Sequence, residues 1–582
     1  MAFQVSPGVE VKEIDATNVI PAVSTSIGGT AGHFLWGPID QVVSVSSEKE
    51  LAQIFGTPDD TTAQYFLPAA GFLKYGQLLK VVRAQASDAV NAAGGTALLI
   101  TNEDALPAAT LTSAGDWVAR YAGALGNSIT VSVCTSAQFA AWNYASSFDS
   151  APATSPFAET IVSSSVTVDG DGKYPHLDEI HVVVFDNDGA ISGTKGTILE
   201  TYSHLSQATN GKNSDGTTNY YKEVINSGSK YIYFGHSTRS GGLTAPTAIT
   251  SSSAAFAAPA GDPDGSTFTI PLTGGIQTSA NSTAAQIATA LAKFDATDIE
   301  DVNLIFAAGD GESSGTGTVL IANKLVALAG TTRKDCVAFV SPPVGFTNGT
   351  RTTPLTDVNT YFKTTLNANS SYVVADSSSL KVYDKYNDVY RHIMASGHIA
   401  GLCANTDRVA DAWFSPAGEQ RGQLLGVTKL GFNPSKTDRD TLYKSNINPL
   451  VSLPGRGTML FGDKTTQNRA SAFDRINVRR LFIVLEKAIS TASEGLLFEF
   501  NDEFTRANFR NMIEPFLREV KGRRGITDFL VICDETNNTG NVIDSNQFVA
   551  DIFIKPARSI NYITLNFVAT RTGVEFSEIA GQ

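Results

Sequence analysis

The segment at residues 311–315, GESSG, is the stretch of this sequence that most suggests covalent catalysis. It matches the G-x-S-x-G pattern, in which a sharp turn between a strand and a helix presents a nucleophilic serine, here Ser313. That turn must follow its strand directly, whereas residues 307–310 separate GESSG from the preceding apolar strand. We therefore interpret the segment as a flexible Gly/Ser-rich turn, and a serine hydrolase using Ser313 stays the alternative.

Patterns that could bind phosphate or a metal ion are incomplete. GTMLFGDKT, from Gly457, resembles a phosphate-binding loop, but Asp463 separates the second glycine from the lysine and would repel phosphate. Segments starting at Asp169, Asp186 and Asp262 look like partial calcium loops without the acid that completes an EF-hand, and we interpret them as hairpin turns. We therefore predict no catalytic residues, no cofactor and no metal site.

The composition indicates a long, acidic, globular chain. Its 582 residues exceed what one core organises, and 42% hydrophobic residues can fill several domains. A net charge of −14 argues against nucleic acid as a partner. The chain start shows no signal-peptide pattern, and no run approaches the ~20 apolar residues of a membrane span, so we expect a protein made in a cytoplasm without membrane insertion. Four widely spaced cysteines suit a reducing compartment: Cys134, Cys336, Cys403 and Cys533.

Hydrophobic spacing predicts regular helices and strands near both ends of the chain. Residues 46–58, SSEKELAQIFGTP, combine a serine, acids and helically spaced apolar residues, and predict a capped helix stopped by Gly56. Residues 78–84, LLKVVRA, predict a short buried strand. Later come two amphipathic helices, at residues 475–490 and at 508–520 with Pro515 as a kink, and two strands at residues 528–534 and 560–570.

The region between residues 84 and 297 has a different composition. It is rich in Ala, Ser, Thr and Gly, and approaches low complexity near residues 245–266. Apolar runs such as SITVSV at residues 128–133 and EIHVVVF at 179–185 predict strands between loops. We interpret this region as a β-rich outer insertion whose length is free to vary.

Short strand patterns lie at both termini. Val9 and Val11 point one way along an extended strand while Glu10 and Lys12 point the other, and a Pro-containing linker follows. The C-terminus carries VEFSE, at residues 574–578, after a short TRTG segment. A strand attached through a linker raises the question of which sheet it joins.

A basic cluster interrupts the acidic chain. Residues 505–528 hold six Arg and Lys side chains against three acids, a local net charge of +3. A solvated helix end, favoured by the helix dipole, and a functional contact are both compatible with this pattern.

Both terminal thirds of the sequence carry longer motifs. At the N-terminal end these are SPGVEVKEID, GHFLWGPIDQVVSVSSEKELAQIFGTP and FLKYGQLLKVVRA. The C-terminal set includes YDKYNDVYRHIMASGHIAGLCANTDR, INVRRLFIVLEKAI, CDETNNT and IDSNQFVADIFIKPARSINYITLNF. In these motifs, which cover about half of the chain, the sequence resembles the tail sheath proteins of contractile bacteriophages, in the long form of large myophages.

The resemblance implies a multidomain α+β or α/β fold with nested, discontinuous domains. An α/β inner core domain would face the tail tube, a second α/β domain would be split around the insertion, and the β-rich insertion would protrude. The implied parts are residues 1–20 for an N-terminal strand arm and linker, 21–86 with 298–436 for the middle domain, 87–297 for the insertion in one or two subdomains, 437–569 for the inner domain, and 570–582 for a C-terminal strand arm.

The resemblance also implies that the terminal strands leave their subunit and complete sheets in neighbouring ones. An added strand satisfies the open backbone groups of a sheet edge, and a linker of about ten residues spans up to ~35 Å. A glycine hinge would let the rigid bodies rotate while the strands stay paired. The implied exchange residues are Val9, Glu10, Val11, Lys12, Val574, Glu575 and Phe576, with Gly573 as the hinge.

The function implied is structural, with no enzymatic activity. The subunit would polymerise as a helical homo-oligomer of hexameric rings around the tail tube, in a metastable extended state, and contract to drive the tube through the host envelope. Expected partners are other copies, the tail tube protein, and baseplate and tail terminator proteins, in the virion tail and, during assembly, in the host cytoplasm. The sheath of a phage-derived injection particle is the alternative. We expect the basic cluster Arg518, Lys521, Arg523 and Arg524 to face an acidic tube surface.

Overall fold

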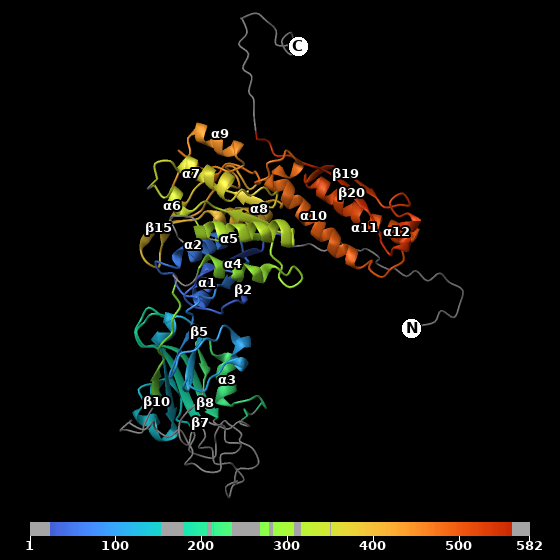
Figure 1. Cartoon of the computed structure of the whole chain (residues 1–582). Helices are drawn as coiled ribbons and strands as arrows, with labels where there is room; N and C mark the ends of the chain where they lie inside the picture. The colour runs from blue at the N-terminus through green and yellow to red at the C-terminus, as the bar shows by residue number, and fades with distance from the viewer. Residues whose placement is uncertain are drawn as a thin grey trace, which may run out of the picture. The chain divides into compact units, whose positions relative to one another are not determined.

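The computed structural model describes residues 24–152, 179–206, 212–213, 215–235, 268–278, 283–307, 316–349 and 351–561. The chain forms two compact units (Figure 1). The larger comprises Ser24–Ala412 and Pro416–Arg479, and the smaller includes Trp413–Ser415 and the described residues from Arg480 onward. In these ranges, no helix combines the length and apolar character that crossing a bilayer requires.

A six-stranded sheet organises the larger unit. Its order is β13-β12-β11-β1-β3-β2, and the strands run parallel except that β2 is antiparallel to β3. Because β1 pairs with both β3 and β11, one sheet joins segments that are far apart in sequence. The strands are β1 (Gly28–Gly32), β2 (Val42–Val45), β3 (Leu79–Arg83), β11 (Leu304–Phe306), β12 (Val337–Val340) and β13 (Val373–Ala375).

Helices cover both faces of this sheet. A Cβ on Gly28 would meet the ring of Phe72, whereas one on Gly29 would approach the ring of Phe294. Successive residues of a strand point to opposite faces, so these two rings cover opposite faces. This double coverage accounts for strands such as β11 and β12 that are apolar on both sides. The covering helices are α2 (Ala63–Leu73) with α8 (Ser396–Val409), and α4 (Ala284–Leu291) with α5 (Thr316–Ala327), which lie side by side in Figure 1.

The predicted capped helix is confirmed as α1 (Glu48–Phe55). The Ser47 side chain accepts a hydrogen bond of 3.2 Å from the backbone N–H of Glu50, as an N-cap does. Gly56 ends the helix with φ +79°, a conformation that glycine adopts without a Cβ clash.

The region predicted to be β-rich contains two antiparallel sheets around a shared apolar core. The predicted strands SITVSV and EIHVVVF are confirmed as β6 and β7, which pair along their length. One sheet has the order β10-β6-β7-β8 and the other β4-β5-β9. The elements are β4 (Asn91–Ala93), β5 (Trp117–Ala122), β6 (Ile129–Thr135), β7 (Glu179–Asp186), β8 (Thr197–Ser206), α3 (Tyr221–Gly228), β9 (Ile232–Phe234) and β10 (Phe268–Pro271).

Smaller sheets complete the larger unit. Asn448 ties residues 437–479 to the six-stranded sheet, because its backbone N–H donates to the carbonyl of Ala375 at 2.9 Å. The remaining elements are α6 (Val344–Thr347), α7 (Pro354–Thr360), β14 (Leu380–Asp384), β15 (Val389–Ile393), β16 (Val427–Leu430), α9 (Lys436–Lys444), β17 (Leu450–Leu453) and β18 (Gly457–Leu460).

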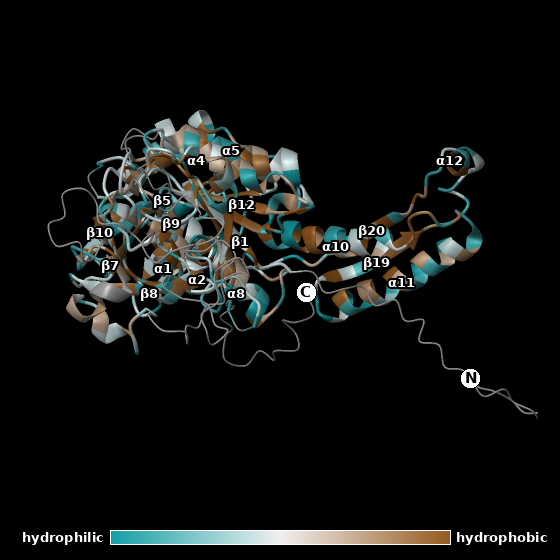
Figure 2. Cartoon of the chain, turned by 90° about the horizontal axis from the view of Figure 1, so that it is seen from below, coloured by the Kyte–Doolittle hydropathy of each residue, from teal (hydrophilic) through white to brown (hydrophobic). Residues whose placement is uncertain are grey.

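The smaller unit packs two helices against a β-hairpin. Both predicted amphipathic helices are present, and hydrophobic and hydrophilic residues alternate along them (Figure 2). Leu485, Ile513 and Leu517 meet Val531 in one core. Pro515 lies within α11, on its exposed side. The elements are α10 (Ile476–Glu494), which enters from the larger unit, α11 (Glu503–Gly522), β19 (Ile526–Ile532), α12 (Gly540–Asp544) and β20 (Asp551–Pro556).

Candidate functional site

Within the described residues, the segments whose sequence suggested catalysis or ligand binding do not come together in one site. Ser313 lies outside the described residues. The stretch that resembled a phosphate loop begins with strand β18, not with a turn, and the Asp463 carboxylate accepts a hydrogen bond of 3.0 Å from Arg475. Strand pairing and this ion pair give the segment a structural role.

The partial calcium loop at Asp186 is a hairpin turn, as predicted. Its carboxylate accepts hydrogen bonds from the backbone N–H groups of Ile191 and Ser192, at 3.0 and 2.7 Å, between β7 and β8. The segments at Asp169 and Asp262 lie outside the described residues. Within the described ranges, no three His, Cys, Asp or Glu side chains gather as metal ligands would.

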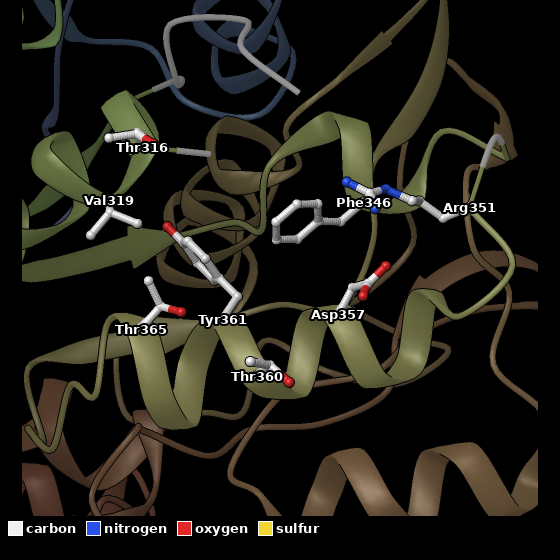
Figure 3. A pocket seen from close by; sticks show the side chains of 8 residues that line it. All are labelled: Thr316, Val319, Phe346, Arg351, Asp357, Thr360, Tyr361 and Thr365. Atoms are coloured by element: carbon white, nitrogen blue, oxygen red, sulfur yellow. The ribbon is translucent and has the colours of Figure 1, made fainter. Parts of the chain in front are cut away.

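A cavity of about 450 Å³ opens beside α5 and α7 (Figure 3). The rings of Phe346 and Tyr361 meet edge to face across 6.2 Å, and the Arg351 guanidinium lies 5.3 Å from the Phe346 ring centroid. Burial raises the pKa of the Tyr361 hydroxyl, which keeps it neutral. Asp357 supplies a carboxylate, but none of the lining residues pairs a nucleophile with a general base.

The basic cluster occupies the C-terminal end of α11 and the turn into β19. Acids partner three of its four members: Arg518 contacts Glu514 at 2.7 Å and Lys521 contacts Asp528 at 3.2 Å. Arg523 contacts Glu519 at 3.5 Å. The hydrogen bond and charge of Lys521 lower the pKa of Asp528. Arg524 follows with φ +67° and is exposed. The structure thus brings all four predicted residues together.

Trp413 is a member of this surface that sequence reasoning missed. Its indole N–H donates to the carbonyl of Arg523 at 3.1 Å, and the Arg523 guanidinium lies 5.4 Å from its ring centroid. The two residues are 110 positions apart, and no spacing rule connects them. The tryptophan fixes the turn that carries Arg523 and Arg524.

The β19–β20 hairpin offers two open edges. Among the described residues these strands pair with each other and with no third strand. An open edge leaves backbone N–H and C=O groups free to pair with an added strand. The predicted exchange residues Val9, Glu10, Val11, Lys12, Val574, Glu575 and Phe576, and the hinge Gly573, lie outside the described residues.

Three family descriptions match successive parts of the chain. Residues 25–84 match the N-terminal region of domain III of the tail sheath protein Gp18, residues 280–466 match the phage tail sheath protein central domain, and residues 468–570 match the phage tail sheath C-terminal domain.

Solved structures share the fold at low sequence identity. A sheath tail protein from Listeria innocua covers 92% of this chain and 96% of its own, with 12% identity and a TM-score of 0.50. The contracted helical sheath of the anti-feeding prophage covers 98% of this chain and 100% of its own, with 12% identity and a TM-score of 0.50.

Curated relatives match over almost their entire length. The chain is 34% identical to the tail sheath protein of Vibrio phage KVP40, over 99% of both sequences. It is 32% identical to the tail sheath protein of Enterobacteria phage T4, again over 99% of both. Identity at this level over the full length shows the relationship directly: the chain belongs to the family of phage tail sheath proteins.

Proposed function

We propose that this protein is the structural subunit of a contractile phage tail sheath. The observation that carries the proposal is its 34% identity to a curated tail sheath protein over 99% of both chains. Subunits polymerise as a helical tube around the tail tube, are held in a metastable extended state, and contract to drive the tube through the host envelope. The role is structural, and the serine hydrolase alternative has no support from the relatives.

Exchange of the terminal strands holds the subunits together in this proposal. The support is the β19–β20 pair, which has no third strand among the described residues. Residues 574–576 join the sheet of a neighbouring subunit beside residues 9–12 of another subunit, and Gly573 bends while the ladder stays intact. Contacts of this head-to-tail kind propagate as a helix instead of closing a dimer.

The basic cluster at the end of α11 faces the tail tube in this proposal. Arg524 and the two exposed ion pairs of Arg518 and Arg523 present cationic groups to solvent. Each exposed pair contributes well under ~1 kcal/mol, but a helical lattice repeats the contact at every subunit. An acidic tube surface is the complement that this cluster requires.

The proposal also assigns a position in the sheath to each part of the chain. In the proposed layout, residues 21–86 with 298–436 form the middle domain, 87–297 an outward insertion, and 1–20 and 570–582 strand arms. Residues 437–569 form the inner domain, of which 437–479 pack within the larger unit and the described residues from 480 onward within the smaller one. Subunits form hexameric rings, and baseplate and terminator proteins bind the two ends of the stack. The protein resides in the virion tail after assembly in the host cytoplasm. Full-length identity to phage proteins favours a phage sheath over the sheath of an injection particle.

Electron microscopy of the purified protein tests the proposed function. Long hollow tubes with a regular helical repeat are expected, both alone and around added tail tubes. Compact particles at concentrations well above those needed for tube assembly would contradict the proposal.

A further inference from the structure

A β-bulge interrupts the pairing of β7 with β8, two strands that lie side by side in Figure 1. The register between them shifts at His181, so that this one residue of β7 faces two residues of β8, Ser203 and His204. His204 adopts φ +52°, which is uncommon for a residue other than glycine. A bulge takes residues out of the regular ladder, so their backbone groups need other partners.

Side chains from other positions supply partners for His204. Its backbone N–H donates to Nδ1 of His181 at 3.0 Å, and its carbonyl accepts a hydrogen bond of 2.7 Å from the side-chain amide of Asn219. Its ring nitrogen Nε2 lies 3.1 Å from the hydroxyl oxygen of Ser150. The bulge is therefore held by side chains, and one of these, the fully buried His181, is able to titrate.

The hydrogen bonds of His181 fix its protonation state. A backbone N–H always donates, so Nδ1, which accepts from His204, carries no proton. Nε2 lies 2.9 Å from the carbonyl oxygen of Ser150, which always accepts, so Nε2 carries the proton. The ring is therefore a neutral imidazole with both nitrogens in use, and Nδ1 is the one atom at which a second proton binds.

Aromatic rings exclude water from this imidazole. Phe148 stacks on His181 with the ring centroids 4.3 Å apart, and Phe139 packs nearly perpendicular to it at 5.7 Å. An imidazolium in such surroundings loses the hydration that it has in water.

The ionisable groups that face His181 come from three strands. Burial lowers the pKa of His181 most, and the His204 ring on β8 lowers it further. The Ser150 carbonyl and the Glu179 carboxylate on β7 raise this pKa, but they do not outweigh burial. Cys134, opposite on β6, stays uncharged because burial raises the pKa of its thiol to about 12. The net effect favours the neutral ring as long as the bulge keeps this arrangement.

We propose that His181 is a pH-sensitive latch, which holds the bulge of β8 closed at neutral pH and releases it in acid. A proton from solvent binds the Nδ1 lone pair, and the new N–H of the imidazolium then points at the N–H of His204. Two donors repel each other where a hydrogen bond stood, and the added charge is buried. Opening the bulge frees His204 from its left-handed conformation and returns the imidazolium to water. The latch goes beyond the proposed function and does not depend on it, because all of its parts lie in one chain.

Hydrogen exchange at residues 203–206 tests the latch in the full-length, unassembled subunit. The closed form loses stability as pH falls below the ordinary histidine pKa of about 6.5, because the open form binds the proton more strongly. Opening should therefore become about five- to tenfold more frequent between pH 7.5 and 5.5, after correction for the intrinsic exchange rate at each pH. His181→Gln keeps a donor and an acceptor but does not titrate, so its opening should be equal at both pH values. His392→Gln, on β15, is the matched control and should respond like the unmodified protein.

Several outcomes would overturn the proposal. Exchange that does not depend on pH in the unmodified protein, or that depends on it equally in His181→Gln, would show that this ring is not a latch. Loss of the pH response in His204→Gln would assign the titration to His204 instead. Nitrogen-15 NMR of the histidine rings in the unmodified subunit is an independent check, which needs no variant to fold. Nδ1 of His181 should carry no proton at pH 7.5, and a protonated Nδ1 at that pH would also overturn the proposal.

Discussion

Arg83 and Gln277 are joined by a hydrogen bond of 2.7 Å, although 194 residues separate them in sequence. Arg83 ends strand β3, where the chain leaves the six-stranded sheet, and Gln277 lies where it returns. The same guanidinium donates to the carbonyls of Gly37 and Ala122, each at 2.6 Å. One buried side chain therefore ties the sheet to both ends of the β-rich region.

Replacing Arg83 should destabilise the larger unit. Its side chain is fully buried and its acceptors are uncharged oxygens, so Arg83→Ala leaves several buried carbonyls without donors. We expect a loss of about 3 kcal/mol or more in the free energy of unfolding, measured by denaturant titration. Arg83→Lys should recover little of this lost stability, because an ammonium group does not reproduce the planar set of N–H donors of a guanidinium group. Exposed Arg469→Ala should change stability by less than ~0.5 kcal/mol, and equal effects of the two alanine variants would contradict this role.

Close packing of α2 against α8 predicts a sharp penalty at Gly397. A Cβ at this position would stand 2.1 Å from the carbonyl oxygen of Pro68, and backbone atoms there cannot move aside. Gly397→Ala should cost about 2–4 kcal/mol in unfolding free energy. Gly522, at the end of α11, has no atom within 4 Å of such a Cβ, so Gly522→Ala should be neutral or stabilise by up to ~1 kcal/mol. Thermal melts of the two variants that shift together would show that the α2–α8 approach tolerates a methyl group.

Local sequence patterns predicted the elements of this fold better than their long-range partners. The capped helix α1 and the amphipathic helices α10 and α11 follow from spacing and caps, because their hydrogen bonds are local. Pairing of β1 with β11 depends on contacts across the whole β-rich region, which no local pattern encodes. The basic cluster was visible as a charge run, whereas the contact of Trp413 with Arg523 and the hydrogen bond of Arg83 to Gln277 arise only when distant segments pack together.

Buried histidines should make the subunit less stable at acidic pH. His398 packs in α8, and burial lowers its pKa to about 3, while the pKa of His33 falls to about 4 for the same reason. The unfolded chain therefore binds more protons than the folded one below pH 6.5, and stability falls as pH decreases from there. Burial raises the pKa of Asp376 to about 7, and this shift has the opposite effect on stability. The stabilisation that protonated Asp376 gives the folded subunit is lost as pH rises from about 4 to 7.

The substitution His398→Gln separates the effect of this histidine on the pH dependence of stability from the effect of Asp376. His398→Gln should remove about 1–2 kcal/mol of the stability loss between pH 6.5 and 5, because glutamine binds no proton. Denaturant titrations of unassembled subunit at both pH values give the difference. An unchanged pH slope in the variant would mean that His398 is protonated in the folded state.

Charge reversal in the basic cluster should impair assembly on tail tubes. Arg523→Glu with Arg524→Glu replaces two exposed cations, and its cost to folding is small because the ion pair of Arg523 with Glu519 lies at the surface. We expect weaker co-assembly with tubes and unchanged self-assembly, both scored by sedimentation and electron microscopy at moderate salt. Lys429→Glu with Lys436→Glu applies the same change of charge at exposed positions of the larger unit. If both double variants bind tubes equally well, the cluster does not face the tube.

Deletion of residues 1–15 should block polymerisation and leave the subunit folded. In the proposal the N-terminal strand pairs with a sheet edge of another subunit and contributes nothing to the stability of its own. Each ladder hydrogen bond contributes roughly 0.5–1.5 kcal/mol net, and a strand repeated at every subunit makes the lattice resistant to tearing. The truncated protein should therefore unfold at the same denaturant concentration as the full chain, yet sediment as monomer where the full chain forms tubes. Replacing the alternating Val9 and Val11 by serine, with Glu10 and Lys12 retained, tests whether pockets for these side chains set the register, and should raise the critical concentration without abolishing tubes. Regular tubes of normal length from the truncated protein would show that the N-terminal strand is not an exchanged element of the sheath.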